Sequence, residues 1–497
     1  MPILSTLLFL PFAGALVIML LPGSLRRAIK WVAVVTSLGC LVLSLYVFLG
    51  YDHQAGGYQL LESYPWFPPL GISLILGVDG ISAPMVLLTG IVIFTGVLMM
   101  CTLETRVKDF FFLLLVLVGG VYGTFMSLDL FFFFFFYELA VIPMYPLIGV
   151  WGSSTDFGVF LRTKEYGAMK LVLYLVAGSV PVWIALIAIY VQSGAGSFSL
   201  FELQKARFSL EFQNIFFPFV MIGFGVLAGL WPFHTWSPDG HVAAPTGVSM
   251  LHAGVLMKLG AYGIIRVGMT LMPEGAVTWM PFLLVLATIN VLYGAVSAMA
   301  QGDLKYVVGY SSVSHMGYVL MGFGTLSVVG MNGAVLQMFS HGIMTALLFA
   351  VVGVLYDRSH IREIAKFGGL ARRMGVVATF LMVAGLTSLG LPGLSGFVAE
   401  FLVFVGAFQT YPLVAVLGVI GAAITAVYIL RLLATVLFGP LGEQWQHIRD
   451  ASPLEGVSMA ILVFVLVLVG LFPNSLMPII SSGVENLEKI VPLVKAG

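Results

Sequence analysis

The sequence contains few charged residues and few cysteines. Only 9% of its 497 residues are Asp, Glu, Lys or Arg, and the formal net charge is zero. This balance excludes a basic nucleic-acid surface and an acidic tail. Cys40 and Cys101 lie in apolar runs without metal-ligand spacing, so we interpret them as small core residues. Zinc, haem, iron–sulfur, nicotinamide and flavin motifs are all missing, so we expect no metal and no cofactor in this chain.

Long apolar runs are abundant instead. Hydrophobic residues make up 60% of the chain, in recurring runs long enough to cross a hydrocarbon core. This pattern predicts an all-α polytopic membrane protein, because a barrel needs short alternating strands. We predict about fourteen helices, at roughly 3–22, 29–50, 79–101, 110–127, 129–150, 167–192, 213–240, 247–270, 279–300, 304–328, 331–356, 374–410, 412–438 and 456–473.

The distribution of positive charge predicts the orientation of these helices. With the N-terminus outside, the inner loops hold Arg26, Arg27, Lys30, Arg106, Lys108, Arg162, Lys164, Lys305, Arg358, Arg362, Lys366, Arg372, Arg373 and Arg449. The outer segments then hold only Lys205, Arg207, Lys489 and Lys495. Because cytoplasmic loops are enriched in Lys and Arg, we expect a multi-pass protein with its N-terminus outside.

The seventh and twelfth predicted helices contain breaks. The stretch 231–245 has prolines at 232, 238 and 245, and 391–396 reads LPGLSG. Paired broken helices in oppositely oriented halves are typical of inverted-repeat transporters, and two unrelated proline kinks are the alternative. We divide the chain into N-terminal helices (1–109), a first repeat (110–270), a second, inverted repeat (279–438), and a C-terminal helix with its tail (439–497).

Four charges lie inside apolar segments: Glu138, Lys258, Lys305 and Glu400. A charge within a membrane helix is costly, so it usually has a task or a partner. Desolvation disfavours the charged form, which allows each group to accept and release a proton. The alternatives are a structural ion pair for Glu138 and an anchor at the inner membrane surface for Lys305. Glu400 directly follows a helix break and is our candidate for the final proton acceptor.

Histidines provide further candidates, because histidine titrates near physiological pH. His315 and His341 are expected at similar depth, near mid-membrane, on neighbouring helices. His252 is either a relay group or a satisfied core residue. His234 and His241 flank the proline-rich break, and we expect no metal there because a third ligand at fitting spacing is missing.

Other polar residues have simpler interpretations. Asp79, Asp129, Asp239 and Asp303 lie at helix ends or breaks, where capping or turn formation is the expected role. Arg266 is expected to extend its side chain to the outer interface. The phenylalanine run at 131–136 is interpreted as a lipid-facing or packing surface.

Several long motifs occur in order. They begin with MSLDLF at 126–131 and YELAVIPMYPLIGVWG at 137–152, followed by WPFHTWSPDGH at 231–241. GDLKYVVGYSSVSHMG at 302–317 and LPGLSGFVAEF at 391–401 come next. Together they resemble subunit 4 of NADH:quinone oxidoreductase, the bacterial M subunit of respiratory complex I. That family is related to the subunits of cation/proton antiporters.

The resemblance implies fourteen helices, two inverted five-helix units and proton pumping driven by remote electron transfer. It places Glu138 and Lys258 at the glutamate of the fifth helix and the lysine of the eighth. Lys305, His315 and His341 match relay positions of the second half, and Glu400 matches the twelfth-helix position. The family usually carries a lysine in the seventh helix, where Leu227 stands here. Our hypothesis is that His252 or Lys258 pairs with Glu138 instead.

We therefore predict a proton-translocating subunit of a respiratory NADH:quinone oxidoreductase in an energy-transducing membrane. Protons are expected to pass the broken seventh helix and move along Lys258, Lys305, His315 and His341 to Glu400, with Glu138 as an electrostatic switch. The redox chemistry belongs to peripheral partner subunits, and the direct partners are lipid and other membrane subunits, including related antiporter-like ones. The alternatives are a subunit of a sodium/proton antiporter, of a hydrogenase or other dehydrogenase, or a non-pumping structural subunit.

Overall fold

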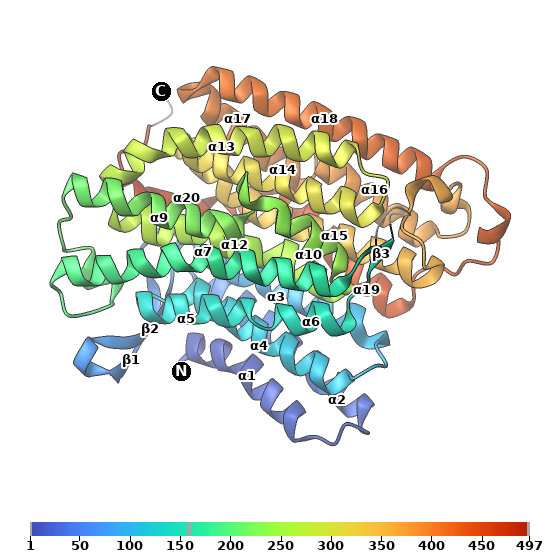
Figure 1. Ribbon diagram of the computed structural model, residues 1–497, viewed down its shortest axis with the longest axis horizontal. Helices are drawn as coiled ribbons and strands as arrows, with labels where there is room; N and C mark the ends of the chain where they lie inside the picture. The colour runs from blue at the N-terminus through green and yellow to red at the C-terminus, as the bar shows by residue number, and fades with distance from the viewer. Residues whose placement is uncertain (1, 157–160, 495–497) are drawn as a thin grey trace.

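The computed structural model describes residues 2–156 and 161–494, which form a bundle of long helices lying side by side (Figure 1). Twelve of its segments are long and apolar enough to cross a membrane. The α14 helix and the α16–α17 pair complete the predicted fourteen spans. The predicted fold class, an all-α polytopic membrane protein, is confirmed. The division into two repeats stays a prediction.

Two of the first seven spans are interrupted. The fifth is split near Pro143, and the seventh is broken before α10. Their bounds are α1 (Ile3–Leu20), α2 (Arg26–Gly50), α3 (Ser82–Met99), α4 (Val107–Met126), α5 (Leu130–Val141) with α6 (Met144–Trp151), α7 (Lys164–Ser193), and α9 (Leu210–Ala228) with α10 (Trp236–Ala243).

The last seven spans follow without a large extramembrane domain among the described residues. They are α11 (Thr246–Leu251) with α12 (Met257–Gly263), α13 (Pro273–Met299), α14 (Leu304–Gly324), α15 (Val328–Ser359), α16 (Gly375–Ser388) with α17 (Ser395–Thr410), α18 (Pro412–Leu437) and α19 (Pro453–Leu471). The breaks predicted in the seventh and twelfth spans are both present, between α9 and α10 and between α16 and α17.

Two elements at the predicted outer face were not expected from the sequence. A hairpin of β1 (Gln59–Phe67) and β2 (Ile72–Val78) precedes α3, and it lies at the opposite end of the bundle from β3 (Thr155–Asp156), which pairs with β4 (Leu161–Arg162) (Figure 1). The short α20 (Met477–Glu488) packs against α3 and α15. Its buried residues recur at helical spacing, a signal that the sequence contained: Ile479, Ile480, Gly483, Val484 and Leu487.

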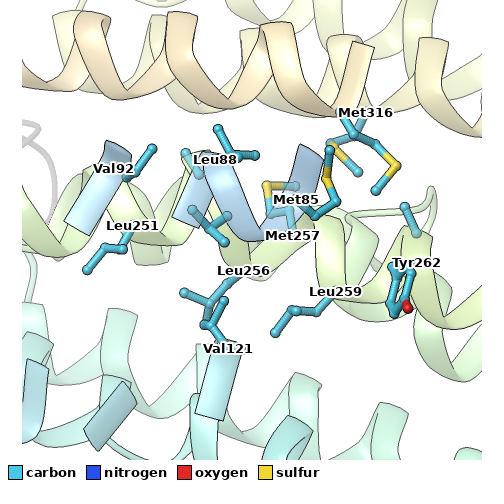
Figure 2. Packing of buried hydrophobic residues seen from close by; sticks show 14 of the residues in the cluster. Met85, Leu88, Val92, Val121, Leu251, Leu256, Met257, Leu259, Tyr262 and Met316 are labelled. Atoms are coloured by element: carbon cyan, nitrogen blue, oxygen red, sulfur yellow. The ribbon is translucent and has the colours of Figure 1, made fainter. Parts of the chain in front are cut away.

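The helices differ sharply in how much of their surface is buried, and this burial limits where ionisable residues can lie. The spans Thr246–Met269 and Val328–Ser359 are enclosed on all sides, whereas α1, α2, α18 and α19 keep one face outward. Apolar side chains from α3, α4, α11, α12 and α14 meet around the enclosed segment (Figure 2). An ionisable residue is tolerated in a membrane helix mainly where neighbouring helices surround it. The enclosed pair of helices is therefore where a proton path can exist.

Candidate functional site: a buried polar path

A line of four buried side chains runs through the enclosed helices. Lys258 Nζ lies 2.9 Å from His341 Nδ1, and His315 Nδ1 lies 3.2 Å from Glu400 Oε1. The rings of the two histidines are stacked between these contacts, with their centroids 5.4 Å apart. Each of the four side chains is at most 3% exposed. Residues from α12, α14, α15 and α17 thus form one polar line in an apolar interior.

The hydrogen-bond partners define where protons sit along this line. Lys258 donates to the carbonyl of Ala253 at 2.5 Å and can donate to His341 Nδ1, which then leaves His341 Nε2 carrying the hydrogen. His341 Nε2 has no partner among the described residues, and it is the atom available to the next ring. His315 Nε2 lies 3.0 Å from Ser388 Oγ, whereas Nδ1 lies 3.2 Å from Glu400 Oε1 and 3.3 Å from Gln337 Nε2, so Nδ1 is shared between these two neighbours.

A widened turn positions Lys258. Residues His252–Leu256 form a π-helix between α11 and α12, and Ile264–Met269 form another. In a π-helix the backbone hydrogen bonds join residues five positions apart. Lys258 lies five residues after Ala253, and its Nζ donates a hydrogen bond to the Ala253 carbonyl. Such turns are concentrated at functional sites, and this one fixes the amine that begins the line.

Two glycines allow the helices that carry Lys258 and His341 to approach. A Cβ built on Gly342 would lie 2.6 Å from the carbonyl oxygen of Gly254, and one on Gly254 would lie 3.1 Å from that of Gly342. Small residues at a membrane helix contact let two backbones meet closely. Since Gly342 directly follows His341, this backbone contact determines the distance between the histidine and Lys258.

Glu400 lies where the break in the twelfth span was predicted to place it. It belongs to the second turn of α17, which begins at Ser395 after the irregular residues 389–394. Hydroxyl groups accompany it: Ser395 Oγ lies 2.7 Å from Ser340 Oγ, and Ser388 contacts the same histidine as Glu400. The end of the line is therefore lined with groups able to donate and accept protons.

The position of Lys305 corrects the predicted order of transfer. Its Nζ donates to the carbonyls of Val242 at 3.4 Å and Ala244 at 2.9 Å, at the end of α10. It does not stand between Lys258 and His315, because Lys258 contacts His341 directly. An exposed interfacial anchor is also the wrong description, since Lys305 is 2% exposed. Carbonyls at a helix C-terminus are instead its favourable partners.

The histidines around the seventh-span break fall into two groups. His241 and His252 face each other with ring centroids 4.1 Å apart, and His252 also stacks on Trp236. Lys258 and Lys305 both lie within electrostatic reach of His241. His234 is separate and packs edge-on against Tyr293 at 5.0 Å. None of these three rings has a nitrogen hydrogen-bonded to another described residue.

Glu138 is not paired in the way that we hypothesised. Lys258 is committed to Ala253 and His341, and His252 stacks against aromatic rings, so neither forms an ion pair with Glu138. Glu138 instead borders a crevice of about 280 Å³ lined by aromatic and aliphatic side chains, with Ser179 as a polar neighbour. Leu227 is fully buried and supplies no charge.

A cluster at the predicted inner face was missed by the sequence analysis. Asp239 lies 2.5 Å from an Nη of Arg162 and 2.8 Å from Lys170 Nζ, and it accepts a hydrogen bond from Tyr306 at 3.1 Å. Asp239 is 5% exposed and lies in the first turn of α10, so its ion pairs are a role beyond the capping or turn formation that we expected. Lys170 lies within the apolar run of α7, and this was the available signal.

A second buried ion pair lies near the opposite face. Arg266 Nη2 is 2.7 Å from Asp79 Oδ2, and the guanidinium also donates to Tyr58 and Tyr262. Arg266 is 4% exposed, so the prediction that it reaches the interface is wrong. Asp79 does form a turn before α3, as expected, because its other oxygen accepts from Ile81 N and Ser82 N.

Two capping predictions are confirmed. Asp129 caps α5, and Asp303 caps α14 through Lys305 N and Tyr306 N. Within residues 2–156 and 161–494, no group of three or more His, Cys, Asp or Glu side chains is arranged to hold a metal ion.

Comparison with known proteins identifies the family. The family described as NADH:quinone oxidoreductase/Mrp antiporter, TM matches residues 127–425. NADH-quinone oxidoreductase subunit M of Rickettsia prowazekii is 36% identical over 98% of this chain and 99% of its own. The chain belongs to this family. The predicted resemblance is thereby confirmed.

Solved structures of the family agree with this assignment. A chain of respiratory complex I from Thermus thermophilus matches with a TM-score of 0.88 and 28% identity, over 98% of this chain and 100% of that one. The Mrp complex of a Dietzia species matches with a TM-score of 0.83 but 18% identity, over 98% of each chain, and shows the shared fold alone.

Proposed function

We infer that this chain is the proton-translocating membrane subunit of an NADH:quinone oxidoreductase and that its buried polar line carries the proton. The observation that supports this most is the continuous contact from Lys258 through His341 and His315 to Glu400. The Rickettsia prowazekii relative is named NADH-quinone oxidoreductase subunit M, and the Thermus thermophilus structure is that of respiratory complex I. The redox chemistry lies in partner subunits, and this chain contributes only proton transfer.

The proton moves by exchange between neighbouring groups. A proton that reaches Lys258 passes to His341 Nδ1, and His341 releases its Nε2 proton toward His315. His315 then releases the proton on Nδ1 to Glu400 and regains one from the His341 side. Lys258 returns to its starting form, and the two histidines end as their opposite neutral tautomers, which ring rotation resets before the next proton. Glu400 becomes the neutral acid and releases the proton beyond α17.

The remaining predicted features belong to this proposal. The chain resides in an energy-transducing membrane with its N-terminus outside, beside lipid and other membrane subunits that include related antiporter-like chains. His241 and His252 connect the seventh-span break to Lys258, because His241 lies within electrostatic reach of both Lys258 and Lys305. Glu138 acts from the crevice at α5 as a charge without an ion-pair partner among the described residues.

The test uses the whole complex in inside-out membrane vesicles. Glu400→Gln keeps the side-chain volume but removes the carboxylate, and Lys258→Met removes the amine. We expect each variant to lower the number of protons taken up per NADH oxidised by at least twofold. Glu443→Gln, on the exposed loop after α18, is the matched control. Parental proton uptake per NADH in both relay variants would refute the proposal, and purification without redox subunits would favour the antiporter alternative.

A further inference from the structure

A buried glutamine and Glu400 both lie within reach of one nitrogen of His315. Gln337 belongs to α15, is 1% exposed, and places its Nε2 3.3 Å from His315 Nδ1. Glu400 Oε1 lies 3.2 Å from the same nitrogen. A ring nitrogen of neutral histidine carries either one hydrogen or one lone pair, so it bonds to one of these neighbours at a time. The protonation of Nδ1 therefore decides which neighbour it bonds to.

The two alternative bonds belong to different forms of the His315 ring. With the hydrogen on Nδ1, the ring donates to the Glu400 carboxylate and can release its proton there. With the hydrogen on Nε2, the ring donates to Ser388 Oγ at 3.0 Å, and the Nδ1 lone pair accepts an N–H of Gln337. The amide nitrogen thus stabilises the form in which His315 has already given up its Nδ1 proton.

Close packing of α15 against α17 fixes the position of this amide. A Cβ built on Gly333 would lie 2.6 Å from the backbone nitrogen of Val403, and Ser340 Oγ lies 2.7 Å from Ser395 Oγ. Gln337 stands between these two contacts, about one helical turn from each. Its side chain is therefore held against α17, at the level where that helix carries its buried carboxylate.

The oxygen of the amide has no partner that fixes its direction. Gln337 Oε1 is buried and accepts no hydrogen bond from another described residue. Rotation of a carboxamide by a half turn exchanges its nitrogen and its oxygen. Facing His315, the nitrogen donates to a lone pair on Nδ1, and the oxygen accepts from a hydrogen there. Both orientations make one hydrogen bond to the ring, so the amide can follow either form of the histidine.

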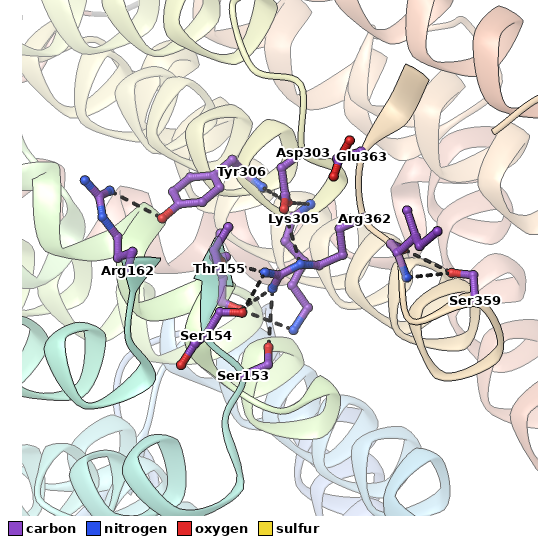
Figure 3. Close-up of polar contacts among 12 residues, drawn as sticks. Ser153, Ser154, Thr155, Arg162, Asp303, Lys305, Tyr306, Ser359, Arg362 and Glu363 are labelled. Atoms are coloured by element: carbon purple, nitrogen blue, oxygen red, sulfur yellow. Dashed lines mark hydrogen bonds and ion pairs between the residues drawn. The ribbon is translucent and has the colours of Figure 1, made fainter. Parts of the chain in front are cut away.

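The amide differs in kind from the titratable groups around His315. Those groups are Glu400 on α17, His341 on α15, Tyr318 on α14, Tyr428 on α18 and, through His341, Lys258 on α12. The cations nearer the inner face belong to a separate network, in which Arg362 contacts Asp303 beside Lys305 (Figure 3). Gln337 does not titrate, so it can respond to the state of the ring without taking the proton itself.

We propose that Gln337 is a positioning residue that selects the hydrogen-bonding form of His315. While Nδ1 carries a proton, the amide nitrogen is turned away and the proton is shared with Glu400. Once Glu400 has taken the proton, the amide nitrogen donates to the lone pair on Nδ1. This bond stabilises the ring after transfer and hinders return of the proton until the ring is reset. The inference rests on the proposed function, because it concerns one step of that relay.

The test uses the whole complex in inside-out vesicles and measures proton uptake per NADH. Gln337→Met keeps the length of the side chain and removes its donor and its acceptor. Gln337→Glu keeps the shape and the acceptor, and its carboxyl group regains a donor only when it is protonated. Each variant is measured at about pH 8 and about pH 6 in one vesicle preparation, relative to the parent at the same pH.

Gln213→Met is the matched control for loss of a buried amide. Gln213 is 4% exposed, donates to the Phe208 carbonyl and accepts from the backbone nitrogen of Glu274, away from the polar line. This exchange should leave uptake per NADH unchanged. Assembly of every variant is checked by size-exclusion chromatography.

We expect Gln337→Met to lose at least twofold of its uptake per NADH at both pH values. Gln337→Glu should show a similar loss at the higher pH and regain parental uptake at the lower one, because the protonated carboxyl group can again donate to Nδ1. A merely structural role of the side chain would not respond to pH within one assembled preparation.

Parental uptake in Gln337→Met overturns the inference, and so does a loss in Gln337→Glu that is equal at both pH values. If Gln337→Met does not assemble, the comparison of pH values in Gln337→Glu decides alone. If Glu400→Gln lowers uptake and the Gln337 variants do not, only the role of Gln337 is refuted. If all of them keep parental uptake, the proposed function fails as well.

Discussion

Replacing Gly342 by alanine tests whether helix contact controls the polar line. The added Cβ would stand 2.6 Å from the Gly254 carbonyl oxygen and 2.8 Å from the Leu88 side chain. Ordinary contact begins at 3.4 Å, so the backbones must separate by about 0.8 Å, the difference between these distances. The 2.9 Å contact of Lys258 with His341 would then lengthen to about 3.7 Å, beyond hydrogen-bond range.

The expected consequence is a loss of proton transfer with the complex still assembled. Gly342→Ala should lower proton uptake per NADH by at least twofold, as expected for the relay variants, because the hydrogen bond between Lys258 and His341 is lost. Uptake is followed by dye quenching in inside-out vesicles, and NADH oxidation is measured in parallel. Assembly is checked by size-exclusion chromatography of the detergent-solubilised complex.

Gly456→Ala provides the matched control. Gly456 lies in α19, and a Cβ there meets nothing within 4 Å. The exchange should leave uptake unchanged, and the helix gains up to about 1 kcal/mol from replacing glycine. Normal uptake in Gly342→Ala, with the assembled complex, would show that the Gly254–Gly342 contact does not set the distance between Lys258 and His341.

Three further substitutions test other parts of the structure by thermal unfolding of the purified complex. Asp79→Asn keeps the turn before α3 but leaves Arg266 buried without its counter-charge, so we expect a loss of about 3–5 kcal/mol. The double variant Asp79→Asn with Arg266→Met should recover most of this loss, and an unchanged transition in Asp79→Asn would contradict a buried pair. Lys170→Met leaves Asp239 in contact with Arg162 and Tyr306, so its loss should be smaller than that of Asp79→Asn, and a larger loss would show that Lys170 is the main partner. Ser452→Ala removes a capping box with Glu455 and should lower the free energy of unfolding by about 1 kcal/mol. Ser452→Thr should keep the box and the stability, so an equal loss in both variants would exclude capping as the cause.

Many side-chain roles followed from local sequence, and the failures share one cause. The helix caps by Asp129 and Asp303 were predictable because a cap depends on the next three residues. Asp239 and Arg266 were misjudged because their partners come from distant segments, such as Lys170 on α7 and Asp79 before α3. The charge of Lys170 within an apolar run was visible, and applying the criterion used for Lys258 would have identified it.

The sequence by itself determined that this protein is a helical membrane protein, where its two broken spans lie, and which family it belongs to. Hydrophobic length, proline position and ordered motifs are local properties, so the chain displays them before it folds. Only the tertiary structure decided that Lys258 contacts His341, that Lys305 donates to carbonyls at the end of α10, and that Glu138 has no counter-ion within the described residues. Such contacts depend on how closely helices pack, and that is set by pairs such as Gly254 and Gly342, which lie far apart in the chain.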